Sequence, residues 1–139
     1  MKYMIMLYGS QDDYDAMAGT STRQPAWSSD ELAALGKFME EWSAEFMETG
    51  EMVSGFGLVA PVHTRRVSLK AGVPVVTDGP YSETQEVLAG YNIVECDSFD
   101  RATEIAARLA KCPVPAAVAE TYAWHVDVRP IEGGFETGS

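Results

Sequence analysis

Two short runs that are apolar at almost every position constrain the fold of this chain more than any other feature. The first is residues 2–8, with Tyr, Ile and Leu at alternate positions and Met, Met and Tyr between them. The second, residues 87–95, is also apolar on both faces for most of its length. Successive side chains of a strand point to opposite faces, so a strand of this kind needs cover on both. We expect both runs to be strands, covered by helices on one face and by a second sheet or subunit on the other.

Two amphipathic segments predict the helices. A capping-box pattern at residues 28–31 precedes apolar residues at helical spacing, which predicts a helix over 29–49. A second helix is expected over 99–110, capped by Asp97 or Ser98.

The remaining segments predict loops and further strands. Residues 9–27 are polar and show no sustained period, so we expect a long loop of the kind that is often functional or mobile. Residues 52–59 predict a strand interrupted by glycines, which indicates a bulge or a close backbone approach. A hairpin is expected over 64–77, around a Gly-containing turn. The last strand, 122–131, alternates strictly between apolar and polar residues.

This order of elements predicts the fold class. Two strand–helix–strand halves with a hairpin inserted between them predict an α+β fold, a ferredoxin-like βαββαβ sandwich with its helices on one face. We expect one domain over residues 1–131 and a flexible Gly-rich tail over 132–139. The helix-free face would be a large exposed apolar patch in a monomer, so a homodimer is expected.

Charge and composition exclude several classes of partner. The chain has a net charge of −11, which opposes nucleic acid and anionic membrane surfaces, so neither is expected as a partner. No apolar run is long enough to cross a membrane, and no cleavage site follows the first strand, so a cytoplasmic protein is expected. Cys96 and Cys112 have no metal-ligand spacing and are expected to be buried free thiols. No metal motif or cofactor motif is present, and we expect neither a metal nor a cofactor.

The first candidate functional residue is Asp78. Gly79 tolerates unusual backbone angles and Pro80 fixes the next residue, so the turn could hold the carboxylate in a defined direction at the end of a strand. Fixed geometry is what a general acid or base needs. The same tripeptide is also good turn chemistry, in which the Asp side chain bonds only to the backbone. Both interpretations remain open.

His125, Asp127 and Arg129 form a second candidate site. If the apolar residues between them face the helices, these three side chains point to the helix-free face. They could then make an anion-binding or proton-transfer site, with Arg129 as a donor to a carboxylate or phosphate. The alternatives are a solvated edge strand and a salt-bridged dimer seam.

Other candidates depend on tertiary contacts. His63 lies in a loop and could meet Asp78 across the hairpin, although a loop histidine is usually solvated. Tyr81 and Tyr91, together with Tyr8, could line a ligand pocket or pack in the core. The carboxylates of Glu83 and Glu86 are expected to be solvated.

Several of these residues also carry a resemblance to a known family. The sequence is similar to YCII-related proteins of the DGPF-domain branch over roughly residues 1–131. The shared segments are Met-Lys-Tyr-Met at the start, Gly57-Leu58 before Ala60-Pro61, Val-Thr-Asp-Gly-Pro-Tyr at 76–81 with Glu83, Thr84 and Glu86, Gly90-Tyr91, Glu95 and Val-Asp-Val-Arg-Pro-Ile at 126–131. The Asp-Gly-Pro signature is fairly specific in this context.

The resemblance implies a dimeric α+β barrel built from two ferredoxin-like subunits, and a His–Asp pair as catalytic residues. It implies no particular reaction, because that branch is largely uncharacterised. The sequence departs from the pattern at Tyr81, where Phe is usual, at Gln85, where Lys is expected, and at Asp127, where Glu is common. Because Gln85 is neutral, the loop lacks the positive charge that a Lys would supply.

Two functions follow from these residues. The first is a cofactor-independent enzyme that acts by acid–base proton transfer on a small organic or lactone-like substrate, with Asp78 paired with His125 or His63. The second is a non-catalytic regulatory or small-ligand-binding module, in which the dimer cleft holds a ligand and residues 9–27 close over it. The absence of a complete catalytic constellation in the sequence favours the second.

Overall fold

The computed structural model describes residues 1–79, 81–120 and 124–137. In chain order its helices and strands are β1 (Lys2–Gly9), α1 (Gln11–Ala18), α2 (Ser29–Glu48), β2 (Met52–Gly57), β3 (Arg65–Lys70), β4 (Val73–Asp78), β5 (Val87–Glu95), α3 (Phe99–Ala107) and β6 (Val126–Pro130).

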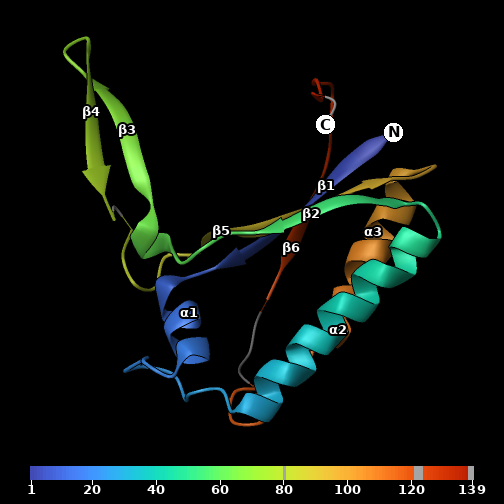
Figure 1. Ribbon diagram of the computed structural model, residues 1–139, viewed down its shortest axis with the longest axis horizontal. Helices are drawn as coiled ribbons and strands as arrows, with labels where there is room; N and C mark the ends of the chain where they lie inside the picture. The colour runs from blue at the N-terminus through green and yellow to red at the C-terminus, as the bar shows by residue number, and fades with distance from the viewer. Residues whose placement is uncertain (80, 121–123, 138–139) are drawn as a thin grey trace.

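The main sheet has the strand order β2-β5-β1-β6, and every neighbouring pair is antiparallel. This is the order of a ferredoxin-like α+β fold, as the sequence predicts. Helices α2 and α3 lie along one face of the sheet (Figure 1). Strands β3 and β4 form the separate inserted hairpin.

The hydrophobic core lies between the sheet and these two helices. Ile5 of β1 and Val94 of β5 are fully buried against Phe46 of α2 and Ile105 of α3. The neighbouring Trp42 donates its indole N–H to the Ile105 carbonyl oxygen at 3.0 Å, which satisfies a polar group inside the core. Alternate residues of β1 therefore pack against the helices, as predicted.

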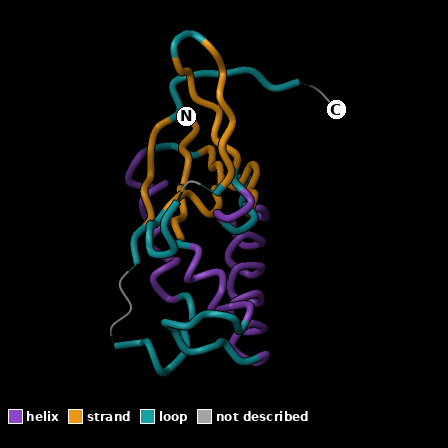
Figure 2. The backbone as a smooth tube through the Cα atoms, turned by 90° about the vertical axis from the view of Figure 1, so that its left-hand side faces the viewer, coloured by secondary structure: helices purple, strands orange, loops and turns teal. Residues whose placement is uncertain are grey.

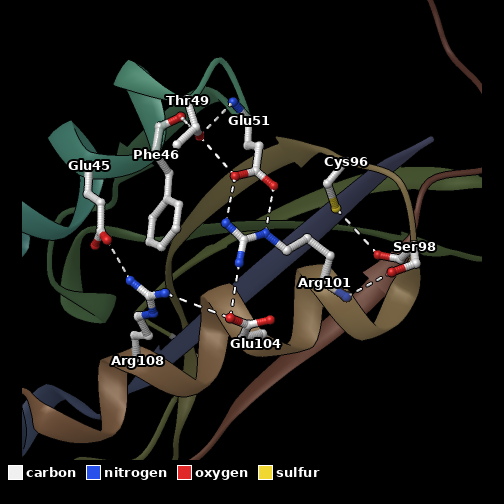
Figure 3. A network of polar contacts seen from close by, with 9 residues as sticks. All are labelled: Glu45, Phe46, Thr49, Glu51, Cys96, Ser98, Arg101, Glu104 and Arg108. Atoms are coloured by element: carbon white, nitrogen blue, oxygen red, sulfur yellow. Dashed lines mark hydrogen bonds and ion pairs between the residues drawn. The ribbon is translucent and has the colours of Figure 1, made fainter.

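A network of charged side chains closes the end of the core where α2 turns into β2 (Figure 3). Arg101 of α3 donates two hydrogen bonds to the Glu51 carboxylate, at 2.8 and 2.9 Å. The guanidinium groups of Arg101 and Arg108 both lie over the ring of Phe46, at 5.6 and 5.1 Å from its centroid. Glu51 lies in the short connection between α2 and β2, so its pairing with Arg101 of α3 connects both helices to the edge of the sheet.

The opposite face of the sheet carries no helix in the described part of the chain. By strand alternation and register it presents Met4 and Met6 of β1, Tyr91 and Ile93 of β5, and Phe56 of β2. Phe56 is 60% exposed, and its ring lies beside that of Tyr91, at 5.6 Å between centroids. We call these five residues the open face.

The β3–β4 hairpin projects away from the rest of the molecule (Figures 1 and 2). Its turn is Ala71–Gly72, and both residues have positive φ, as a tight two-residue hairpin turn requires. One face of the hairpin is apolar and exposed, with Leu69 at 73% and Val67 at 69% exposure. The predicted hairpin is confirmed, and it stands clear of the core.

The structure corrects the prediction that residues 9–27 are a loop, because helix α1 lies within them. Ser10 and Asp13 form a capping box, in which each side chain bonds the other's backbone N–H. The helix has only eight residues, too few for a sustained apolar period. The Tyr14 hydroxyl of this helix donates to the Leu58 carbonyl oxygen at 2.8 Å, so a contact with a residue distant in the sequence holds the helix in place.

Two boundaries also differ from prediction. The last strand begins at Val126 rather than at residue 122, and residues 122 and 123 lie outside the described residues. The second predicted helix ends as an α-helix at Ala107 and continues as a 3₁₀ helix to Lys111. The register of β2 against β5 shifts between Met52 and Ser54, which supports the predicted bulge. At Gly55 a Cβ atom would collide with the side-chain amide of Asn92, whereas the space beside Gly57 is open.

The helices of the described residues include none that is long and apolar enough to cross a membrane.

The Glu51–Arg101 pair predicts a specific dependence of stability on pH. The hydrogen-bonded guanidinium of Arg101 lowers the pKa of the Glu51 carboxyl from 4.5 to about 2. A carboxyl with a depressed native pKa stabilises the fold fully above its unfolded pKa and loses that effect as pH falls through the native one. The contribution of Glu51 should therefore disappear between pH 4.5 and about 2.

Glu51→Gln should lower the thermal midpoint at neutral pH by about 3 °C, because a partly exposed ion pair contributes modestly. It should also flatten the loss of stability on acidification, measured by urea unfolding monitored by tryptophan fluorescence. Glu48→Gln is the matched control, since Glu48 is an exposed carboxylate at the end of α2. An unchanged acid slope in Glu51→Gln would contradict the assignment.

Candidate functional site

Four polar side chains from distant parts of the sequence meet beyond one end of the open face. Tyr8 lies near the end of β1, Asp127 lies in β6, His125 precedes β6, and Glu86 precedes β5. We call these four residues the Tyr8 cluster. Register places Asp127 opposite Met6, so its side chain points to the helix-free side, as the sequence predicts.

Tyr8 and Asp127 form the shortest contact of the cluster. The Tyr8 hydroxyl donates to Oδ2 of Asp127 at 2.8 Å. This hydrogen bond, with smaller effects of burial and of the Asp127 charge, raises the pKa of Tyr8 above its usual 10.0, while the charge of Arg129 opposes the increase. Tyr8 therefore stays a protonated donor over the physiological pH range.

His125 lies between an aromatic ring and a carboxylate. Its imidazole stacks on Tyr8 with ring centroids 5.1 Å apart, and its Nδ1 lies 4.0 Å from Oε2 of Glu86. Both members of the His125–Glu86 pair are about half exposed, so a molecule bound on this side of the sheet would reach them. The sequence identified His125 and Asp127 as candidates, but it gave no sign that Tyr8 and Glu86 lie beside them.

Asp78 lies elsewhere, at the base of the inserted hairpin. Its carboxylate pairs with Nε of Arg65 at 3.6 Å, and its side chain is 83% exposed. The next residue, Gly79, has a positive φ and donates its N–H to the Thr64 carbonyl oxygen at 3.0 Å. The turn does hold Asp78 at a strand end, and its carboxylate partner is an arginine rather than a histidine.

The other candidate residues are divided between the inserted segment and the main sheet. His63 lies in a 3₁₀ helix at Pro61–His63, and its side chain is exposed, with no hydrogen bond, ion pair or ring contact to any described residue. Tyr81 lies under the guanidinium of Arg66, at 5.1 Å from the ring centroid. Tyr91 belongs to the open face, and Arg129 of β6 lies opposite Met4 on the same side.

A cavity of about 320 Å³ lies between α1 and the ends of β1, β2 and β5. Its lining includes Asp13, Tyr14, Met17, Gln24, Trp27 and Ala89. Most of these residues belong to the segment predicted to be a loop, so the sequence did not identify the cavity. Its best sequence signal is the Ser10–Asp13 capping pattern, which marks the start of a helix in that segment.

The described residues contain no group of three or more His, Cys, Asp or Glu side chains placed to hold a metal ion. Cys96 is buried and Cys112 is half-buried, and both are free thiols.

Comparison with known proteins identifies a matching family and a relative. The family model described as the YCII-related domain matches residues 1–125. An uncharacterised protein of Rhizobium meliloti (strain 1021) is 29% identical over 85 residues, which cover 61% of this chain and 68% of that protein.

The Tyr8–Asp127 contact predicts a measurable coupling. Asp127→Asn removes the negative charge and weakens the acceptor, so the pKa of Tyr8 should fall toward its usual value. The titration can be followed by NMR of ring-labelled tyrosine, with Tyr8→Phe for assignment. Tyr14 is the internal control, because burial raises the pKa of its hydroxyl and Asp127 does not. If Tyr8 titrates alike with and without the Asp127 carboxylate, the hydrogen bond is not formed in solution.

Proposed function

The chain belongs to the YCII-related family, and we propose that it is a cofactor-independent enzyme that transfers protons on a small organic substrate, with the Tyr8 cluster as its centre. The observation that carries this proposal is the convergence of Tyr8, Glu86, His125 and Asp127 from separate segments onto one end of the helix-free face. Interacting acid and base groups that are open to a ligand are the usual components of such a site.

Each residue of the cluster has a proposed role. The imidazole of His125 has two ring nitrogens that can donate or accept a proton, so His125 is the proton carrier, and the Glu86 carboxylate beside it orients it. The Tyr8 hydroxyl donates its one proton to Asp127 in the free protein. On binding, it exchanges this acceptor for the substrate oxygen on which charge develops. Arg129, on the same side of the sheet, attracts an anionic group of the substrate.

Asp78 remains a second candidate for the proton-transfer role. The segment around it supports assignment of the chain to the DGPF branch of the family. In its observed position the carboxylate is paired with Arg65 and largely exposed, so it would have to leave that pair before acting on a substrate. We therefore give His125 the first role. Tyr81 beside Arg66, and His63 in the neighbouring 3₁₀ helix, would border a ligand bound near Asp78.

We propose further that the protein is a homodimer that associates through the open face. Phe56 is 60% exposed there, and Tyr91, Met6 and Met4 on the same face of the sheet are half-buried. A contiguous apolar surface on a sheet is favourable to bury, and a second copy of the same face is self-complementary. The partner would then shield the Tyr8 cluster at the margin of the interface from solvent and complete a substrate cleft.

A non-catalytic binding module is the alternative function. It is favoured by the distance of 4.0 Å between His125 and Glu86, which is longer than a hydrogen bond. In that case Arg129, Asp127 and Tyr91 would serve only to hold a ligand. The two free thiols support a reducing compartment such as the cytoplasm for either function.

The two functions are separated by a screen of small lactones and carboxylic acids, first for thermal stabilisation and then for turnover. The enzyme hypothesis predicts that a stabilising compound is converted and that His125→Asn lowers kcat/KM by about 10²-fold to 10⁴-fold. Asp78→Asn should have a smaller effect, because its carboxylate is engaged with Arg65. His63→Asn is the matched control for an exposed histidine outside the cluster.

Binding without turnover would support the module instead. Turnover that survives His125→Asn but is lost in Asp78→Asn would move the reaction centre to the hairpin base.

The dimer proposal predicts that light scattering of the 15.1 kDa chain gives about twice that mass at micromolar concentration. Phe56→Glu places a charge in the proposed interface and should raise the dimer dissociation constant at least about tenfold. Phe135→Glu is the matched control, because Phe135 is 90% exposed and lies in the C-terminal segment. A monomeric wild type, or equal effects of the two variants, would rule out the open face as the interface.

A further inference from the structure

The cavity beneath α1 is a second candidate site. It adjoins the Tyr8 cluster, because Tyr8 is also one of its lining residues, but most of its wall comes from other residues. Its volume of about 320 Å³ lies at the lower end of the range for small-molecule pockets, about 300 to 1,000 Å³. An apolar protein cavity of about 150 Å³ is known to hold one benzene molecule. The space beneath α1 is therefore large enough for a substituted aromatic ring.

We propose that this cavity binds a flat, largely apolar organic molecule that is neutral or positively charged, with a protonated arylalkyl amine as the best match. The proposal does not depend on the Tyr8 cluster being catalytic.

The side chains of the walls favour a flat ring. Tyr14 and Trp27 supply aromatic surfaces, and Met17 supplies a polarisable thioether, which contacts rings favourably. The indole N–H of Trp27 makes no hydrogen bond to any described residue, so it is available as a donor to a ligand. The polar groups are few, as in most ligand pockets, and they would set the orientation of the ring.

The charge of the lining favours a cation over an anion. Asp13 is held in place because its carboxylate accepts hydrogen bonds from the Ser10 N–H at 2.9 Å and from the Gln24 side chain at 3.0 Å. Each carboxylate oxygen has further acceptor capacity, which a ligand N–H could use. The net charge of −11 adds an attractive field for a cation and a repulsive one for a carboxylate.

The cavity is held open by contacts that do not involve a ligand. The Tyr14 hydroxyl donates to the Leu58 carbonyl oxygen at 2.8 Å, and the Asp12 N–H donates to the Glu83 carbonyl oxygen at 2.9 Å. The Asp12 carboxylate, only 7% exposed, binds Ser21 and Gln24 and so fixes the segment that follows α1. Because the walls are fixed in advance, a ligand would pay little to order them.

The experiment uses three probes of similar shape and different charge: benzylamine, benzyl alcohol and benzoate, each titrated into ¹⁵N-labelled protein. We expect the first two to shift the backbone amides of Gly9 and Gly57 and the indole N–H of Trp27, which all belong to residues of the lining. Benzylamine, which is protonated at neutral pH, should bind at least about fivefold more tightly than benzoate.

Two variants test the location and the charge. Met17→Trp fills the cavity and should weaken benzylamine at least about tenfold, whereas Met47→Trp, at an exposed position of α2, is the matched control and should have no effect. Asp13→Asn preserves the volume and should reduce the preference for benzylamine over benzoate to about twofold or less. Asp13→Asn also keeps the test valid if Met17→Trp fails to fold.

Three results would overturn the proposal. The first is the absence of shifts at the lining residues with every probe, even at about 20 mM, since a ring filling such a pocket should bind at least that well. The second is tightest binding of benzoate. The third is equal weakening of benzylamine by Met17→Trp and Met47→Trp.

Discussion

The hydrogen bonding of β1 on both of its edges is the constraint on which the rest of the structure depends. Its register with β5 and β6 places Ile5 in the core and leaves Met6 and Tyr8 on the opposite side. The same strand thus anchors the packed core and carries a member of the polar cluster. A slip of one residue would exchange the two faces, burying the tyrosine hydroxyl and exposing the isoleucine.

The general fold could be predicted from the sequence, because the spacing of apolar residues within each segment indicates a helix or a strand and the order of these segments indicates the fold. Strand Val87–Glu95 is found where its apolar run predicts it, and α2 begins at the predicted capping box. Helix α1 could not be found in this way, because eight residues give no measurable period and tertiary bonds of Tyr14 keep the helix in place. The one local signal of this short helix is its cap, the Ser10–Asp13 pattern.

The candidate site was predictable only in part. Strand alternation correctly assigned Asp127 to the side away from the core. The position of Glu86 beside His125 depends on the path of the chain before β5, which no local pattern encodes. The Asp78–Arg65 pair was within reach of prediction, because a two-residue turn at Ala71–Gly72 fixes which residues of the hairpin lie opposite each other.

The two ends of the inserted segment lie close together, and this affects how the molecule can unfold locally. The Leu58 N–H donates to the Ala89 carbonyl oxygen at 2.8 Å, so the chain leaves and rejoins the main sheet at almost the same point. Within this segment the β3–β4 hairpin is a closed excursion with little attachment to the core, whereas Val87 and Leu88 already pair with β1 and Glu83 accepts from the Asp12 N–H. Such an excursion is a separate cooperative unit, able to melt, exchange its amide hydrogens or vary in length while the four-stranded sheet stays intact.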